Sequence, residues 1–275
     1  MNILVTGSAG FIGFHFCKKL LKETNYKIYG LDNLNNYYSV KLKKKRIRIL
    51  QKYKNFRFNK KDLKDDKTYN LFKKIKFSFI FHLAAQAGVR YSVSDPKRYI
   101  DDNVIAFSKL LDFSRSQNCK CIFYASSSSV YGDSKILPST ENMKLNPKNV
   151  YGLTKKFNEE LSSFYSKNYN QRIIGLRFFT VYGPWGRPDM LILKLLDIIK
   201  NNKIFTLNNF GKHKRDFTYI DDVTHMMLKL LNNYKKTNIN DIFNICSNNP
   251  INLMKIINYI FKKTKKIKIR KVSLQ

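Results

Sequence analysis

Acidic residues and long apolar runs are what this sequence most plainly lacks. Its 275 residues include 19 Asp and Glu against 52 Lys and Arg, a formal net charge of +33. No apolar run approaches the roughly 18 residues needed to span a membrane. The first residues lack the basic region and long apolar core of a signal peptide. We therefore expect a soluble globular protein in the cytoplasm.

Cysteines with metal-ligand spacing are absent as well. The four cysteines are Cys17, Cys119, Cys121 and Cys246, and they do not follow a zinc-binding pattern. Because cysteines of cytosolic proteins are normally reduced, we predict free thiols and no metal.

Glycine and proline are scarce, with 11 and 6 residues, whereas Lys, Asn, Ile and Tyr are abundant. This combination is typical of AT-rich coding, so the positive charge need not mean a polyanionic partner. Two dense basic runs, 41–61 and 255–271, contain no acidic residue. We interpret them as solvated faces and expect neither a nucleic-acid nor a membrane partner. A basic cleft would still help to hold a nucleotide diphosphate.

A strand, a glycine turn and a helix open the chain. Residues 2–6 are apolar enough for a buried strand, and Gly7, Gly10 and Gly13 follow at once. In a dinucleotide site the first glycine permits a tight turn, the second lets the backbone approach a pyrophosphate, and the third allows close packing of helix and strand. The helix N-terminus adds free N–H groups for the phosphates.

A second strand, residues 27–31, ends at Asp32. A carboxylate at this place accepts hydrogen bonds from an adenosine ribose and repels a 2′-phosphate. Because strand, glycines, helix, strand and Asp occur in the required order, the sequence predicts an NAD site.

Strands and helices continue to alternate as far as residue 177. The further strands are predicted at 55–59, 76–82, 119–125 and 173–177, and the helices at 37–54, 96–117 and 151–168. This alternation predicts an α/β protein, a Rossmann-like doubly wound parallel sheet with helices on both faces. Ligands bind at the carboxyl ends of such strands.

After residue 177 the pattern changes to a turn-rich loop followed by short mixed elements. We therefore predict two domains. Residues 1–177 form an NAD-binding Rossmann domain, and residues 178–275 form a smaller mixed α/β substrate lobe.

Tyr151 and Lys155 are four residues apart on the predicted helix, so both side chains lie on one face. An ammonium beside a phenol favours the phenolate. The phenolate could then take a proton from a sugar hydroxyl.

Several strings of the sequence resemble those of the extended short-chain dehydrogenase/reductase family. They are GSAGFIG (7–13), LDNLNNYY (31–38), HLAAQAGVRYS (82–92), YASSSSVYG (124–132), YGLTK (151–155), RFFTVYGPWGRPDM (177–190) and GKHKRDFTYIDD (211–222). Within that family they are most similar to NAD-dependent nucleotide-sugar epimerases, and closest to UDP-glucuronate 4-epimerases. The resemblance extends from residue 1 to about residue 260.

The resemblance implies a role for each matching position. Tyr151 is the catalytic base, Lys155 tunes it, and Ser127 supplies the catalytic hydroxyl, with Ser126 and Ser128 beside it. The positions that contact NAD are Gly7, Gly10, Phe11, Ile12, Gly13, Asp32, Asn33, Asp62, Leu63, Leu83, Ala84, Ala85, Gln86, Asn103, Tyr151, Lys155 and Phe178. The positions that contact substrate are Arg90, Ser127, Thr180, Arg187 and Arg215, of which Thr180 and Arg187 hold a sugar carboxylate. His82 is expected to be a structural histidine.

The implied reaction is inversion of C4 of a UDP-sugar through a transient 4-keto intermediate. UDP-glucuronate and UDP-galacturonate are the favoured pair, as precursors of cell-surface polysaccharide, and a homodimer is the usual assembly. UDP-glucose/galactose 4-epimerisation is the nearest alternative. Dehydratase and decarboxylase relatives carry a carboxylate just before V-Y-G, where this chain has Ser128 and Ser129, so we rank those activities lower.

The C-terminus differs from the family pattern, because relatives normally continue for several dozen residues beyond this chain's last residue. We expect from this an incomplete substrate lobe with weaker substrate affinity. A truncated, inactive nucleotide-sugar-binding protein is therefore a further alternative.

Overall fold

The computed structural model describes residues 1–134, 136–264 and 268–272, and contacts within it group the chain into two compact units. Unit 1 comprises residues 1–178 and 224–245, and unit 2 comprises residues 179–223 and 246–275.

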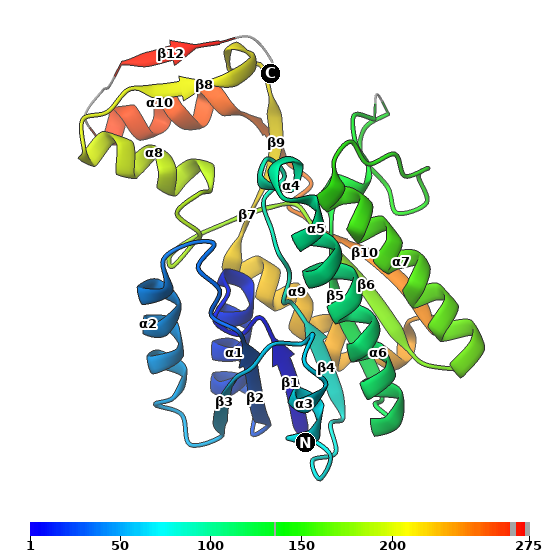
Figure 1. Cartoon of the computed structure of the whole chain (residues 1–275). Helices are drawn as coiled ribbons and strands as arrows, with labels where there is room; N and C mark the ends of the chain where they lie inside the picture. The colour runs from blue at the N-terminus through cyan, green and yellow to red at the C-terminus, as the bar shows by residue number, and fades with distance from the viewer. Residues whose placement is uncertain (135, 265–267, 273–275) are drawn as a thin grey trace. The chain divides into compact units, whose positions relative to one another are not determined.

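Unit 1 is built on a seven-stranded sheet in which every pairing is parallel (Figure 1). The strand order is β10-β6-β5-β4-β1-β2-β3. These strands are β1 (Asn2–Thr6), β2 (Lys27–Asp32), β3 (Phe56–Lys60), β4 (Phe79–His82), β5 (Cys121–Ser127), β6 (Ile173–Phe178) and β10 (Asn240–Ile245). Because the chain reverses its direction of winding between β1 and β4, a switch point lies there, as in dinucleotide-binding sheets. The predicted fold class is confirmed.

Helices cover both faces of this sheet, so its central strands are buried on both sides and mainly apolar. On one face Phe107 and Leu110 of α6 pack with Ile122 of β5. On the other face, Phe16 of α1 lies with its ring centroid 4.4 Å from that of Phe81 of β4. The helices of unit 1 are α1 (Phe11–Glu23), α2 (Val40–Leu50), α3 (Asp66–Asn70), α4 (Tyr91–Ser94), α5 (Pro96–Tyr99), α6 (Ala106–Gln117), α7 (Val150–Tyr169) and most of α9 (Ile220–Asn232).

In its described residues, unit 2 contains two small sheets, the helices α8 and α10, and the start of α9. One sheet has the order β11-β9-β7 and the other pairs β12 with β8. The elements are β7 (Thr180–Tyr182), α8 (Leu191–Lys200), β8 (Phe205–Leu207), β9 (Lys214–Tyr219), β11 (Pro250–Asn252), α10 (Leu253–Lys263) and β12 (Ile269–Lys271). Leu195, Phe205, Leu207 and Ile257 form its core.

Two features of the fold differ from the sequence-based picture. The predicted domains met at residue 177, whereas unit 1 also takes up residues 224–245, because β10 pairs with β6 at the edge of the large sheet. The helix predicted over 96–117 is interrupted by a π-helical turn at Ile100–Ile105. Both features depend on contacts between segments far apart in sequence.

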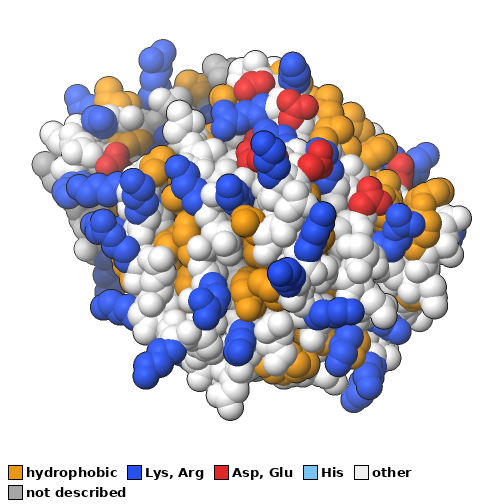
Figure 2. Space-filling view, turned by 60° about the horizontal axis from the view of Figure 1, so that its bottom comes forward, with side chains coloured by type: hydrophobic (Ala, Val, Ile, Leu, Met, Phe, Trp, Pro, Cys, Tyr) orange, Lys and Arg blue, Asp and Glu red, His pale blue; other side chains and the backbone are white. Residues whose placement is uncertain are grey.

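Basic side chains are widely distributed on the surface. Figure 2 shows Lys and Arg spread over the face it presents, without a single dense patch. Residues 265–267 of the second basic run lie outside the described residues. No helix among the described residues is both long and apolar enough to cross a membrane.

Candidate functional site

The sheet of unit 1 aligns the carboxyl ends of its central strands. Thr6 at the end of β1 lies in register with His82 at the end of β4, and His82 lies in register with Tyr124 of β5. Ser127 at the end of β5 is paired with Phe178 at the end of β6. The sheet thus brings the predicted glycine turn, the segment after β4 and the serine cluster to one edge.

The glycine turn after β1 accepts only glycine at two positions. Gly7 has φ of +70°, and a Cβ there would lie 2.6 Å from the backbone nitrogen of Ala84. A Cβ on Gly13 would lie 2.2 Å from the carbonyl oxygen of Gly7. These distances are far below van der Waals contact, so the turn between β1, β4 and α1 is as closely packed as a dinucleotide site requires.

Two buried polar atoms beside this turn find no partner among the described residues. They are the hydroxyl oxygen of Ser8 and the side-chain amide oxygen of Gln86, which follows β4. Buried polar groups are almost always hydrogen-bonded, so such atoms are expected where a polar ligand binds. The residues present therefore fit a dinucleotide laid over the glycine turn.

Asp32 is buried at the end of β2. Its carboxylate accepts hydrogen bonds from Ala9 N at 3.1 Å and Leu34 N at 2.8 Å. Burial raises the pKa of Asp32, while these bonds and the charges of Lys43 and Arg46 act in the opposite direction. A carboxylate offers about four acceptor sites, so capacity for ribose hydroxyls remains.

Lys43 and Arg46 were not predicted as part of the site, and the expectation of a solvated basic face is wrong for them. Arg46 is fully buried and donates to Ala9 O in the glycine turn at 2.8 Å. Lys43 donates to Asn35 O at 2.8 Å. The signal was present in the spacing, because both residues share the buried face of α2 with Ile47.

The other predicted cofactor positions are linked to one another. Asn33, after β2, donates to Asp62, after β3, at 3.0 Å. Asn103 lies in the π-helical turn and is fully buried, accepting from Gln86 N at 2.8 Å and donating to Thr154 of α7 at 3.1 Å. Phe11 and Leu63 are buried, while Ile12, Leu83, Ala84 and Ala85 are half-buried.

The predicted catalytic pair lies on α7, whose N-terminus is capped by Asn149. Tyr151 is half-buried in the first turn. The ammonium nitrogen of Lys155 is 5.9 Å from the centroid of the Tyr151 ring and donates to Ala125 O of β5 at 2.7 Å. Burial lowers the pKa of Lys155 to about 8, and the negative charge of Glu159 opposes that shift.

The three predicted serines differ in their surroundings. Ser126 directs its hydroxyl to the Glu159 carboxylate of α7 at 2.5 Å. Ser127 Oγ accepts from Ser129 N at 3.2 Å, and Ser128 begins a short 3₁₀ turn. Ser127 lies at the end of β5, and within the described residues its hydroxyl accepts this bond but donates none, as a catalytic hydroxyl requires.

His82 is fully enclosed beneath this edge. Its Nδ1 is 2.9 Å from the Thr6 hydroxyl, and its ring stacks on Phe107 with centroids 5.2 Å apart. Burial, and secondarily the charge of Lys155, lowers the pKa of His82 to about 3. A neutral, enclosed imidazole is what a structural histidine presents.

The predicted substrate contacts are divided between the units. Arg90 is exposed at the start of α4 in unit 1. In unit 2, Thr180 opens β7 and Arg215 is exposed on β9. The Arg187 guanidinium forms a two-point ion pair with Asp189, with N–O distances of 3.0 and 2.5 Å. Arg187 therefore already presents the paired geometry that a carboxylate needs.

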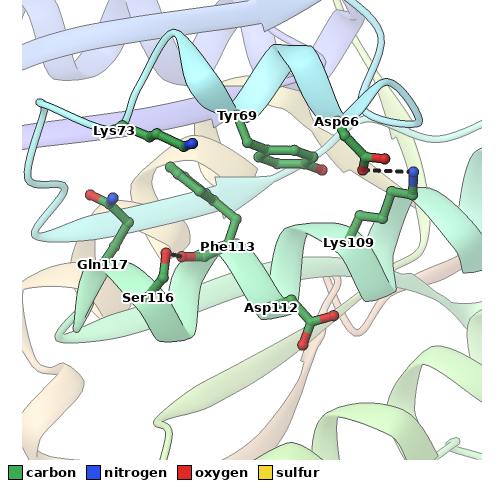
Figure 3. Close-up of a pocket in the computed structure, with 8 residues that line it drawn as sticks. All are labelled: Asp66, Tyr69, Lys73, Lys109, Asp112, Phe113, Ser116 and Gln117. Atoms are coloured by element: carbon green, nitrogen blue, oxygen red, sulfur yellow. Dashed lines mark hydrogen bonds and ion pairs between the residues drawn. The ribbon is translucent and has the colours of Figure 1, made fainter.

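A separate pocket of unit 1 contains none of these residues. It has a volume of about 520 Å³ between α3 and α6, where Tyr69 and Phe113 lie beside the Asp66–Lys109 ion pair (Figure 3). Within residues 1–134, 136–264 and 268–272, no cluster of His, Cys, Asp and Glu could hold a metal.

Comparison with known proteins identifies this arrangement. Residues 3–246 match the model of the NAD dependent epimerase/dehydratase family. Protein CapI of Staphylococcus aureus is 42% identical over 280 residues, with 96% of this chain and 83% of CapI aligned. A probable UDP-glucuronate 4-epimerase of Rhizobium meliloti is 39% identical over 232 residues, covering 84% of this chain and 68% of that protein.

Solved structures agree with the sequence matches. UDP-glucuronic acid 4-epimerase from Bacillus cereus, in complex with UDP-glucuronic acid and NAD, superposes with a TM-score of 0.93 at 33% identity, covering 100% of this chain and 87% of that one. UDP-N-acetylglucosamine 4-epimerase from Methanobrevibacter ruminantium gives a TM-score of 0.87 at 25% identity, with coverage of 100% and 86%.

Proposed function

This chain belongs to the NAD dependent epimerase/dehydratase family, and from that premise we propose that its substrate is UDP-glucuronate and its product UDP-galacturonate. The coarser assignment is an NAD-dependent isomerase that inverts C4 of a UDP-sugar. The observation that carries the proposal is the placement of Tyr151 and Lys155 against the serine-rich end of β5, at the sheet edge that holds the glycine turn.

In the proposed chemistry, each of these side chains either moves a proton or stabilises a charge. Tyr151, as phenolate, removes the proton from O4 of the sugar, and the Lys155 ammonium stabilises that phenolate. The Ser127 hydroxyl hydrogen-bonds the same oxygen as charge develops on it. When bound at the glycine turn, NAD would supply the acceptor and donor for the hydride that is exchanged at C4.

A uronic acid substrate also needs its carboxylate to be held in a fixed orientation. A 4-keto uronic acid is a β-keto acid, and it loses CO₂ when the bond to the carboxylate is aligned with the carbonyl π-system. We propose that Thr180 and Arg187 hold the carboxylate out of that alignment. The two-point pairing of Arg187 with Asp189 supports this proposal, because it is the geometry in which a guanidinium donates to a carboxylate.

One assay tests the substrate assignment against its alternatives. Purified protein with NAD is incubated separately with UDP-glucuronate and UDP-glucose, and epimers, UDP-pentose and keto products are resolved by chromatography. We expect UDP-galacturonate from UDP-glucuronate. Conversion of UDP-glucose alone would indicate the neutral-sugar epimerase, UDP-pentose a decarboxylase, and no turnover by folded protein a nucleotide-sugar-binding member.

Replacing Arg187 with methionine should discriminate between charged and neutral sugars. Loss of one charge-assisted contact is worth about 2 kcal/mol, or roughly 30-fold in kcat/KM. We expect this loss for UDP-glucuronate and an increase in the UDP-pentose by-product. Arg48→Met, which removes an exposed cation from α2, is the matched control. Unchanged kcat/KM in Arg187→Met would refute the carboxylate assignment.

The rate should fall at alkaline pH because of Lys155. Its pKa of about 8 lies below that of a free lysine, so the ammonium loses its proton as pH rises through this value, and the neutral amine no longer stabilises a phenolate. We expect kcat to decrease by about tenfold per pH unit above that point. A profile of kcat from pH 6 to 10 checks this, and a rate still rising beyond pH 9 would contradict it.

We also propose that two copies associate through α7. Leu153, Phe157 and Phe164 share one face of this helix and are 57%, 47% and 54% exposed, and Ile105 beside them is 43% exposed. An apolar helix face is a natural isologous dimer contact. Light scattering should give a dimer mass that Phe157→Glu reduces to that of a monomer, and a monomeric wild type would refute the proposal.

A role in polysaccharide precursor synthesis and a cytoplasmic location remain predictions.

A further inference from the structure

Among the described residues, Glu159 and Arg177 form the one ion pair in which both side chains are nearly fully buried. Glu159 lies one helical turn after Lys155 on α7, and its side chain is 5% exposed. Its two oxygens accept from Arg177 of β6, Nε to Oε1 at 2.9 Å and the terminal nitrogen to Oε2 at 2.8 Å. Nothing in the chemistry described above uses it.

The carboxylate of Glu159 also reaches the serine cluster. Ser126 donates to Oε1 at 2.5 Å, and Ser126 is the strand neighbour of Arg177 in the β5–β6 register. The residue before it, Ala125, accepts the bond from Lys155. Two consecutive residues of β5 are therefore tied to two residues one turn apart on α7.

From this geometry we propose that Glu159 is a positioning residue for the reaction, which holds the serine end of β5 against the Tyr151–Lys155 turn of α7 and supplies the negative charge that balances the buried Lys155 ammonium. The inference rests on the proposed function of that pair. Ser126 is the residue through which Glu159 holds β5, and Ser127, the next residue, is held at the end of the strand.

The charges around Glu159 support this role. Lys155 on α7 and Arg177 on β6 are cations, whereas His82 on β4 and Tyr124 on β5 stay uncharged, because burial lowers the pKa of the His82 imidazole and raises that of the Tyr124 phenol. Although burial disfavours a charged guanidinium, the bonds to Glu159 raise the pKa of Arg177. Among the described residues, Glu159 is thus the carboxylate that pairs with Arg177 and whose charge also acts on Lys155.

Arg177 is in turn anchored on its other side. It donates to the hydroxyl of Tyr131 at 2.8 Å and to Glu141 O at 3.0 Å. Tyr131 donates to Asn244 of β10 at 2.7 Å, and Asn244 N donates to the Glu141 carboxylate at 2.8 Å. The chain of hydrogen bonds that begins at Glu159 therefore continues through Arg177 and Tyr131 to β10, the edge strand of the sheet.

The test compares Glu159→Gln with Glu160→Gln, an exposed neighbour on the same helix that pairs with Lys156 at 3.7 Å. We expect Glu159→Gln to lower kcat by at least about tenfold, because small misplacements of catalytic groups are costly, with KM nearly unchanged. We expect the alkaline fall in kcat to begin at lower pH, since Lys155 loses its balancing anion. Glu160→Gln should match the wild type, and an unchanged kcat and pH profile in Glu159→Gln would overturn the proposal.

A double variant separates positioning from stability. Glu159→Gln leaves the Arg177 guanidinium buried without its anion, and an unpaired buried charge by itself destabilises the fold. The double variant Glu159→Gln/Arg177→Met removes the unpaired charge. We expect the double variant to regain Tm relative to Glu159→Gln while kcat stays low. Recovery of kcat together with Tm would show that Glu159 is structural only.

A readout independent of turnover completes the test. The ultraviolet absorbance of phenolate is titrated in wild type and in Glu159→Gln, each with Tyr151→Phe as the subtracted background. Loss of the anion lowers the pKa of Lys155. Lys155 is one helical turn from Tyr151 and Glu159 is two turns away, so we expect the loss of the ammonium to outweigh the removal of the more distant negative charge and the Tyr151 midpoint to move upward. If the wild type turns over no UDP-sugar, the proposed function fails, and this titration still decides on Glu159: an unmoved midpoint overturns the inference.

Discussion

Replacing Tyr151 with phenylalanine is expected to abolish epimerisation while leaving NAD bound. The variant keeps the ring and its edge-to-face contact with Tyr99, whose centroid is 6.2 Å away, and loses only the hydroxyl that we propose takes the proton. General-base catalysis contributes about a hundredfold to ten-thousandfold, so kcat should fall by at least about a hundredfold. The measurement is kcat with UDP-glucuronate together with NAD content after gel filtration.

Tyr169→Phe is the control for this result. Tyr169 lies at the far end of the same helix and is 43% exposed, so the loss of its hydroxyl should leave kcat and Tm unchanged. Full activity in Tyr151→Phe would refute the assignment of the base. Loss of NAD along with activity would mean instead that the hydroxyl holds the cofactor.

Replacing Gly7 with alanine is expected to disrupt the cofactor site and much of the stability of unit 1. The new Cβ would require a residue with φ of +70° to hold a side chain 2.6 Å from Ala84 N and 2.7 Å from Leu83 C. A left-handed conformation costs about 1–2 kcal/mol, and overpacking against backbone about 1–3 kcal/mol more. Tm should therefore fall clearly, and NAD binding should be lost.

Lys22→Ala serves as the comparison for Gly7→Ala. Lys22 is exposed in the last turn of α1, the helix that follows the glycine turn. Its removal should therefore leave both Tm and NAD binding nearly unchanged. Thermal unfolding with and without NAD measures both effects. A Gly7→Ala protein that binds NAD as the wild type does would show that the close approach to β4 is dispensable.

The first two strands, the glycine turn and Asp32 could be predicted because their signals are local. Glycine spacing and a strand ending in Asp are readable within about 30 residues, and the pairing of β1 with β2 confirms the order. The spacing of Tyr151 and Lys155 likewise predicted that both lie on one face of α7, where the Lys155 ammonium is 5.9 Å from the centroid of the Tyr151 ring. Their role as a catalytic pair came from the family resemblance and stays a prediction.

The interruption of the helix at Ile100–Ile105 could not be predicted in this way. Asn103 within this turn forms hydrogen bonds with Gln86 and Thr154, which are 17 and 51 residues away in the sequence. Periodicity in the helix itself carries no trace of those partners. The assignment of residues 224–245 to unit 1 has the same origin, since it rests on the β10–β6 pairing.

The sequence by itself determined the fold class and the order of the NAD site, because both are encoded in short-range spacing and residue type, and it predicted that Tyr151 and Lys155 share one face of a helix. The tertiary structure alone decided which charged residues are buried. Arg46 beneath the glycine turn and Glu159 between Lys155 and Arg177 look in sequence like surface charges. What distinguishes them is the strand or turn that folding places opposite them, because a buried charge persists only where partners from elsewhere in the chain supply its hydrogen bonds.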